Sequence, residues 1–175
     1  MERSFYYYLG LAAGIALGVI IVAIAWRIRK KKGLSCAYDE RQIAARGKAY
    51  KYGFFTFLIY FALYGVFQMF TEGKYVTSLS GITIGICVAV FVFASNAVWN
   101  DAYFSVQESP SYYMWLFFAV GLMNLVNGAR GLLGHGEEGM FEENIMCLSV
   151  GVMFVLLMAV VVVKRQKDKK EGEAE

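Results

Sequence analysis

Long runs of apolar residues without a single charge divide this sequence. Five windows contain no Asp, Glu, Lys or Arg: residues 5–26, 53–71, 75–100, 109–129 and 144–163. Each is close to the ~20 residues that an α-helix needs to cross a ~30 Å hydrocarbon core. Because a bilayer offers no water to backbone groups, such segments satisfy their hydrogen bonds internally, as helices. The pattern therefore predicts transmembrane helices.

The predicted fold is all-α: a polytopic membrane protein with five transmembrane helices in a single membrane domain, 1–163. We expect the helices over about 5–26, 53–71, 76–99, 110–129 and 144–163. The first window has the small residues of a signal-peptide cleavage site at 23–25. Its apolar run is longer than the usual ~7–15 residues, however, and the basic segment "WRIRKKK" follows it. We interpret it as an uncleaved anchor.

Composition and charge support this frame and predict the orientation. Hydrophobic residues make up 58% of the chain and there is one proline, which is not typical of a soluble domain. Residues 27–52 hold nine Lys or Arg and the segment from Lys164 holds five, so 14 of the 17 basic residues fall on one predicted side. The positive-inside rule then places the N-terminus outside and the C-terminus in the cytoplasm.

Two segments outside the spans have recognisable patterns. Residues 39–52 alternate charged and apolar positions at helical spacing, which predicts a short basic interfacial helix before the second span. Asp39 is placed to cap it, and Gln42 completes the pattern of a capping box. The last segment, 164–175, has almost no apolar residue and is predicted to be a charged disordered tail.

The basic segment has two interpretations. Lipid is the simpler one, since each Lys or Arg near an anionic leaflet gains ~1 kcal/mol. The sharper hypothesis is that its cations also dock the inner loop, which has carboxylates and no Lys or Arg. The candidate residues for these lipid or inner-loop contacts are Arg41, Arg46, Lys48, Lys51, Asp101 and Glu108.

Small residues at helical spacing predict close helix packing. Gly10, Gly14 and Gly18 share one face of the first span, and Gly81 and Gly85 share one face of the third. In lipid, close backbone approach at small residues is a main source of helix association. The first face could form a dimer, but packing within the chain, for instance between these two faces, is the simpler expectation.

Polar residues at membrane depth are candidates for a transport pathway. Asn96 and Asn100 lie one turn apart at the inner end of the third span, and Asn124, Asn127 and Arg130 form a stripe toward the outer end of the fourth. Such groups are expensive in hydrocarbon unless paired, and they often mark ion or substrate paths. The alternative is hydrogen bonding between helices, with Arg130 reaching the interface.

The sequence predicts no catalytic, cofactor or metal site. It has no zinc-protease, nucleophile-elbow or phosphate-loop motif. The single histidine, His135, stands among glutamates in a glycine-rich segment, which favours a solvated loop over a metal site. Cys36, Cys87 and Cys147 form no pair with metal or disulfide spacing, so we expect them to be packing residues.

One stretch also resembles a known group of proteins. "YDERQIAARGKAYKYGFFTFLIYFALYG", followed by "WNDAYFSVQE" at 99–108, is similar to small bacterial multi-pass membrane proteins of unassigned function. The resemblance covers roughly residues 38–108. It implies a bacterial cytoplasmic membrane and supplies no catalytic or binding residue.

These observations predict a non-enzymatic accessory or interaction component of the cytoplasmic membrane. The expected partners are anionic lipids of the inner leaflet, a second copy of the chain or a larger membrane complex, and no nucleic acid. The alternative is a small transporter or channel that uses the polar residues of the third and fourth spans.

Overall fold

The computed structural model describes residues 9, 12–13, 16–20, 23–24, 27, 38–72, 74–104, 110–135 and 141–173. The chain divides into two compact units, Met1–Ala37 and Tyr38–Glu175. The described residues of the first unit are helical, and Gly18 is exposed. Most of the predicted first span, with Gly10 and Gly14, lies outside the described residues.

Helices make up the second unit, and the described residues contain no strand. Four of these helices are long and apolar enough to cross a membrane. A single π-helical segment, η1, continues α4. The elements are α2 (Glu40–Thr71), α3 (Ser78–Trp99), α4 (Pro110–Arg130), η1 (Gly131–His135) and α5 (Phe141–Gly172). The all-helical prediction is confirmed for the described residues, whereas five spans, including the one over 5–26, stay a prediction.

The first turn of α2 has the capping box expected from the sequence. The Asp39 carboxylate accepts a hydrogen bond from the backbone N–H of Gln42 (2.6 Å), and the Gln42 side chain accepts one from the backbone N–H of Asp39 (3.4 Å). These bonds satisfy N–H groups that a helix N-terminus leaves without partners.

The helix expected over 39–52 forms the first part of α2, which continues through Gly53 without a break, and its interfacial position stays a prediction. Gly53 is buried, and a Cβ there would lie 3.0 Å from the Cβ of Phe93 on α3. Its missing side chain therefore allows close packing of α2 on α3, and that packing supports the helix where glycine alone would weaken it.

The α2–α3 contact uses the small face of α3. Gly81 lies against the ring of Tyr64, and Gly85 lies against the ring of Tyr60. Both tyrosines also donate hydrogen bonds across the contact, Tyr60 to the carbonyl oxygen of Gly81 (2.9 Å) and Tyr64 to that of Thr77 (3.0 Å). Tyrosines of α2 thus occupy the face that we expected to pack on the first span, because a large ring fills the space above glycine.

The α4–α5 contact is also made at glycines. A Cβ at Gly121 of α4 would lie 3.3 Å from the carbonyl oxygen of Gly151, and a Cβ at Gly151 of α5 would lie 3.0 Å from that of Gly121. The two backbones therefore meet directly. Such close approach is the usual way in which helices associate in lipid.

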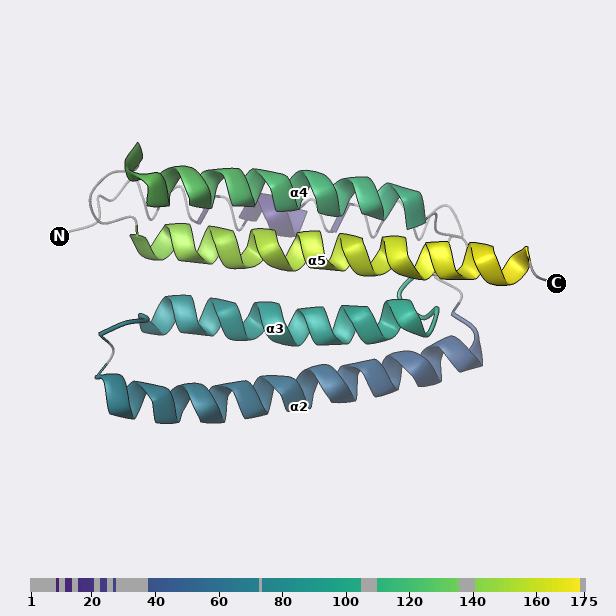
Figure 1. The fold of residues 1–175 in the computed structure, drawn as a ribbon, viewed down its shortest axis with the longest axis horizontal. Helices are drawn as coiled ribbons and strands as arrows, with labels where there is room; N and C mark the ends of the chain where they lie inside the picture. Colours follow the sequence, from purple (N-terminus) through teal and green to yellow (C-terminus); the bar gives the residue numbers. More distant parts are fainter. Residues whose placement is uncertain are drawn as a thin grey trace. The chain divides into compact units, whose positions relative to one another are not determined.

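The four helices lie side by side in one layer, in the order α2, α3, α5, α4 (Figure 1). Among the described helices, α2 packs against α3 alone, and α3 and α4 are separated by α5. A buried cluster near the start of α4 holds α3, α4 and α5 together. It consists of Ala94, Val98, Phe117, Leu157 and Val161.

The end of α5 extends into the charged segment for which the sequence predicts disorder. This segment is helical as far as Gly172. Lys164 pairs with Asp168 (2.7 Å) and Lys167 with Glu171 (3.6 Å), in each case one helical turn apart. Pairs at this spacing support exposed helices, and Lys, Gln and Glu are good helix formers.

Candidate functional site

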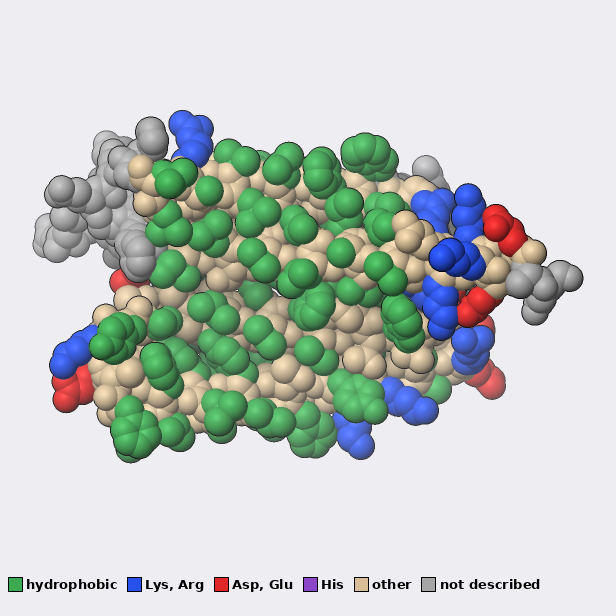
Figure 2. Space-filling view, viewed as in Figure 1, with side chains coloured by type: hydrophobic (Ala, Val, Ile, Leu, Met, Phe, Trp, Pro, Cys, Tyr) green, Lys and Arg blue, Asp and Glu red, His purple; other side chains and the backbone are tan. Residues whose placement is uncertain are grey.

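Charged side chains gather at the end of the layer where α2 begins and α5 ends (Figure 2). The described basic residues at this end are Arg41, Arg46, Lys48 and Lys51 of α2 and Lys164, Arg165, Lys167, Lys169 and Lys170 of α5. At the other end, the described basic residues are Lys74 and Arg130. We call the first end the basic end.

Asp101 joins three helices at the basic end. It follows α3 in a left-handed conformation (φ 54°), which aspartate adopts more readily than most residues. Its carboxylate lies 3.2 Å from the ammonium group of Lys164 on α5 and 4.0 Å from the guanidinium group of Arg41 on α2. The Asp101 side chain is 55% exposed, whereas that of Lys164 is only 17% exposed. The Arg41 side chain is 79% exposed, so Lys164 is the more buried of the two partners of Asp101.

Two polar side chains at the start of α2 also bind the segment after α3. Gln42 donates a hydrogen bond from Nε2 to the carbonyl oxygen of Asp101 (2.7 Å), and the Tyr38 hydroxyl donates one to that of Tyr103 (3.5 Å). Gln42 thus serves both the capping box and this loop. The start of α2 and the loop after α3 form one connected structure.

The expected docking of the basic segment on the inner loop is made by Arg41 and not by Arg46. The Arg46 guanidinium group lies over the ring of Tyr38, 4.2 Å from its centroid, in a cation–π contact. Lys48 and Lys51 are exposed on α2. Glu108 lies outside the described residues.

Two cations of α5 that belong to the predicted disordered tail contact other helices. Arg165 donates to the hydroxyl oxygen of Ser111 on α4 (2.9 Å), and the Lys167 ammonium lies 5.4 Å from the ring centroid of Trp99 on α3. The i, i+4 charge pairs from Lys164 onward were the available indication that the helix continues.

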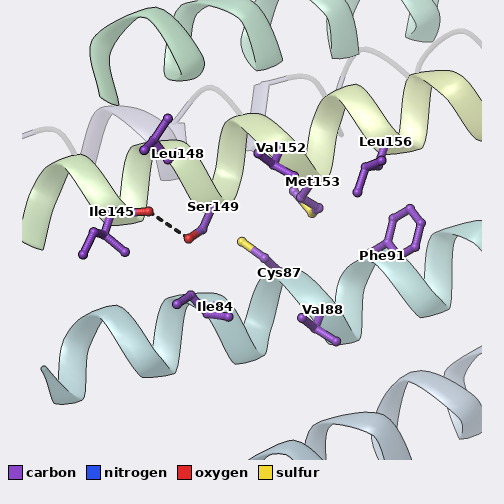
Figure 3. Close-up of a pocket in the computed structure, with 10 residues that line it drawn as sticks. All are labelled: Ile84, Cys87, Val88, Phe91, Ile145, Leu148, Ser149, Val152, Met153 and Leu156. Atoms are coloured by element: carbon purple, nitrogen blue, oxygen red, sulfur yellow. Dashed lines mark hydrogen bonds between the residues drawn. The ribbon is translucent and has the colours of Figure 1, made fainter. Parts of the chain in front are cut away.

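An apolar groove runs between α3 and α5. Figure 3 shows its first part, a hollow of about 400 Å³ into which Cys87 points from α3. The Ser149 hydroxyl in its wall bonds the carbonyl oxygen of Ile145 on the same helix (2.8 Å). The remaining lining side chains shown here are apolar, so this part of the groove can bind hydrocarbon and has little to offer a polar ligand.

The groove continues toward the basic end and becomes more polar. A second hollow of about 480 Å³ shares Phe91 and Leu156 with the first. Its lining adds Ser95, Asn96, Trp99 and Asn100 of α3. Ser95 is notable, because its hydroxyl is buried and is the only such side-chain oxygen or nitrogen in the described part of the chain without a hydrogen-bond partner.

The two sets of asparagines do not come together. Asn96 and Asn100 lie in the groove between α3 and α5, whereas Asn124 and Asn127 are on α4, which α5 separates from α3. Asn124 donates to the carbonyl oxygen of Val120 on its own helix (2.8 Å), and Asn127 and Arg130 are exposed. The described residues therefore assemble no common polar pathway.

The described residues also offer little for catalysis or metal binding. No group of three or more His, Cys, Asp or Glu side chains among them could hold a metal ion. Cys87 is buried and Cys147 half-buried, both as free thiols. What the site can do chemically is bind hydrocarbon along the groove and anions at the basic end.

Comparison with known proteins finds no match among protein-family models, curated proteins or solved structures.

Proposed function

We propose that this chain is a non-enzymatic accessory protein of the cytoplasmic membrane that works by contact with another membrane protein. One observation carries the proposal: the open layer of helices leaves α2 with a single described neighbour, α3. The side of α2 that is turned away from α3 has no neighbour among the described helices, and we call it the free side of α2. Such a side can meet a partner.

The free side of α2 is wide, apolar and aromatic. Leu63 is 67% exposed and Phe70 is 84% exposed. The exposed apolar residues of this face are Phe55, Ile59, Leu63, Val66, Met69 and Phe70. In lipid such a face supports a protein contact through packing and not through a hydrophobic driving force.

The proposed orientation places the basic end in the cytoplasm and the end with Lys74 and Arg130 outside. The gathering of cations at the basic end supports it, since cytoplasmic segments carry the excess of Lys and Arg. The resemblance of residues 38–108 to small bacterial membrane proteins supports the cytoplasmic membrane as the location. Reporter domains fused at the C-terminus and in the loop after α2 test the orientation, which is wrong if the C-terminal reporter is active outside.

Photo-crosslinking in native membranes tests the accessory function. A photoreactive residue at Leu63 or Phe70 is expected to give one discrete protein adduct that saturates with light dose. Positions Tyr60 and Tyr64, which face α3, are the matched controls and should give only crosslinks within the chain. An adduct of twice the mass of the chain identifies a second copy as the partner.

The result that contradicts the proposal is a free side of α2 that labels only lipid. The geometry gives no specific support to the transport alternative, because Asn124 bonds within its own helix. Flux of a solute into proteoliposomes that vanished on changing Asn124 or Asn127 would nevertheless favour transport over the accessory role.

A further inference from the structure

We propose that the groove between α3 and α5 binds one anionic phospholipid. One acyl chain lies along the apolar part, the ester region lies at Asn96 and Asn100, and the phosphate lies at the basic end beside Lys167. This site is separate from the free side of α2, so the lipid and the protein partner are independent proposals.

The groove has the length that an acyl chain needs. Ile84 and Trp99, which line its two ends, are separated by about 22 Å along α3 at 1.5 Å per residue. The hydrocarbon of one leaflet is about 15 Å thick, half of the bilayer core. A chain that enters at Trp99 therefore stays in the groove over its whole depth.

Along the groove, polarity increases in the same order as along a phospholipid, from the acyl chain to the headgroup. The part around Cys87 and Val152 is apolar, whereas Ser95, Asn96 and Asn100 line the part near the basic end. The Asn96 and Asn100 amides each donate one hydrogen bond within α3, to the carbonyl oxygens of Val92 (3.3 Å) and Asn96 (2.8 Å). An amide nitrogen has a second N–H, which can donate to an ester carbonyl oxygen of a lipid at that depth.

Lys167 is the cation placed for the phosphate. Lys164 pairs with Asp101 and Arg165 bonds Ser111, whereas Lys167 makes only an exposed i, i+4 pair with Glu171 (3.6 Å), a weak contact that a phosphate can replace. Lys167 follows the groove residues Val160 and Val163 at helical spacing, and its ammonium lies over the ring of Trp99. Lys170 is exposed three residues further along the helix.

The opposite end of the contact between α3 and α5 disfavours an anionic headgroup. There α5 begins with Glu142 and Glu143, and the Ser80 hydroxyl of α3 donates to the backbone carbonyl of Glu142 (3.5 Å). Carboxylates repel a phosphate, whereas lysines attract it. Charge therefore selects the leaflet at the basic end.

Quenching of Trp99 fluorescence by brominated lipids tests the site. The full chain with Trp26→Phe and Trp115→Phe keeps Trp99 as its only tryptophan. In phosphatidylcholine vesicles, brominated phosphatidylglycerol is expected to quench Trp99 more than its mole fraction predicts. The relative binding constant over brominated phosphatidylcholine should fall about fivefold for each lysine removed in Lys167→Gln and Lys170→Gln.

Lys74→Gln, at the other end of the layer, is the matched control and should leave the preference unchanged. Ala159→Phe fills the groove and should reduce quenching by both lipids. If the chain with Trp99 as its only tryptophan fails to fold, native mass spectrometry can count the phosphatidylglycerol retained by the chain with all three tryptophans. The count is compared between that chain and its Lys167→Gln variant. The proposal is overturned if the unmodified groove shows no preference, if the lysine changes leave it intact, or if a photoreactive residue at Val152 crosslinks to residues 5–26 or to another protein.

Discussion

The carboxylate of Asp101 lies 3.2 Å from the ammonium of Lys164, and this pair connects the end of α3 to α5. The same carboxylate reaches Arg41 on α2 at 4.0 Å. One acidic residue thus links three of the four helices that could span the membrane. Because it lies at the basic end, it also lowers the local positive charge that the cations of α2 and α5 create.

A double-mutant cycle should detect the Asp101–Lys164 pair. Asp101→Asn keeps a residue that tolerates the left-handed backbone and removes only the charge. We expect Asp101→Asn and Lys164→Gln to couple by about 0.5–1 kcal/mol in the free energy of unfolding, the upper range for a partly exposed pair. Unfolding in mixed micelles, followed by far-ultraviolet circular dichroism, measures it.

The matched cycle pairs Asp101→Asn with Arg46→Gln. Arg46 lies over the ring of Tyr38 and makes no described ion pair with Asp101, so this coupling should be close to zero. High salt should weaken the first coupling, since Asp101 is 55% exposed. Equal coupling in the two cycles would show that general charge balance, and not this contact, is being measured.

The sequence predicts that basic residues before the second span meet the acidic loop after the third, but it leaves open which of Arg41 and Arg46 does so. Arg41 and Arg46 have the same charge and lie in the same helix, and the choice between them depends on where Tyr38 and Asp101 lie in space. The contact between Lys164 and Asp101 could not be predicted, for another reason. A charged segment without apolar residues is typical of disorder, and only tertiary contacts and i, i+4 pairs keep it helical.

The glycines of α3 should be intolerant of a methyl group. Gly81→Ala places a Cβ inside the ring of Tyr64, whose hydroxyl is held by the carbonyl oxygen of Thr77. We expect a loss of about 1–3 kcal/mol in the free energy of unfolding, as for overpacking in a core. The same micelle unfolding assay measures it.

Gly65→Ala is the control for Gly81→Ala. No atom lies near the space that a Cβ at Gly65 would occupy, so this change should be neutral or stabilise α2 by up to ~1 kcal/mol. A Gly81→Ala, Tyr64→Leu double variant replaces the tyrosine ring with a smaller side chain. It should recover part of the free energy of unfolding that Gly81→Ala loses. Additive losses in that double variant would mean that the glycine acts through something other than the tyrosine.

Asn124 should be dispensable for stability, although it is an amide at membrane depth. Its side chain bonds Val120 of its own helix, so Asn124→Ala breaks no contact between helices. We expect a change below ~0.5 kcal/mol, in contrast to ~1 kcal/mol for Tyr60→Phe, which removes the bond to Gly81 on α3. A large loss for Asn124→Ala would reveal a partner from another helix or a role in a pathway.

The charge-free windows predict where the helices are, but they do not predict which helix packs against which. Gly81 and Gly85 form a small face in the sequence whichever helix covers them, and the covering tyrosines are on the preceding helix, α2. The groove depends on the order α2, α3, α5, α4, which no local pattern contains. Asn96 and Asn100 were singled out for their polarity, and their place beside Ser95 in that groove follows only from the packing.

Ser95 offers the most direct energetic test of the groove. Its hydroxyl is buried without a partner, so Ser95→Ala should raise the free energy of unfolding by about 1 kcal/mol in micelles that contain no phospholipid. Ser149→Ala is the matched control in the same groove. Its hydroxyl already bonds Ile145 of its own helix, a bond that adds little to helix stability, and its removal should be nearly neutral.

Phosphatidylglycerol should leave the outcome at both serines unchanged. The Ser95 hydroxyl is fully buried in the wall of the groove, so a bound lipid cannot supply its missing acceptor. The unfolding curves of both variants, with and without phosphatidylglycerol, give the comparison. A Ser95→Ala variant that is destabilised even without lipid would show that the hydroxyl has an acceptor within the protein.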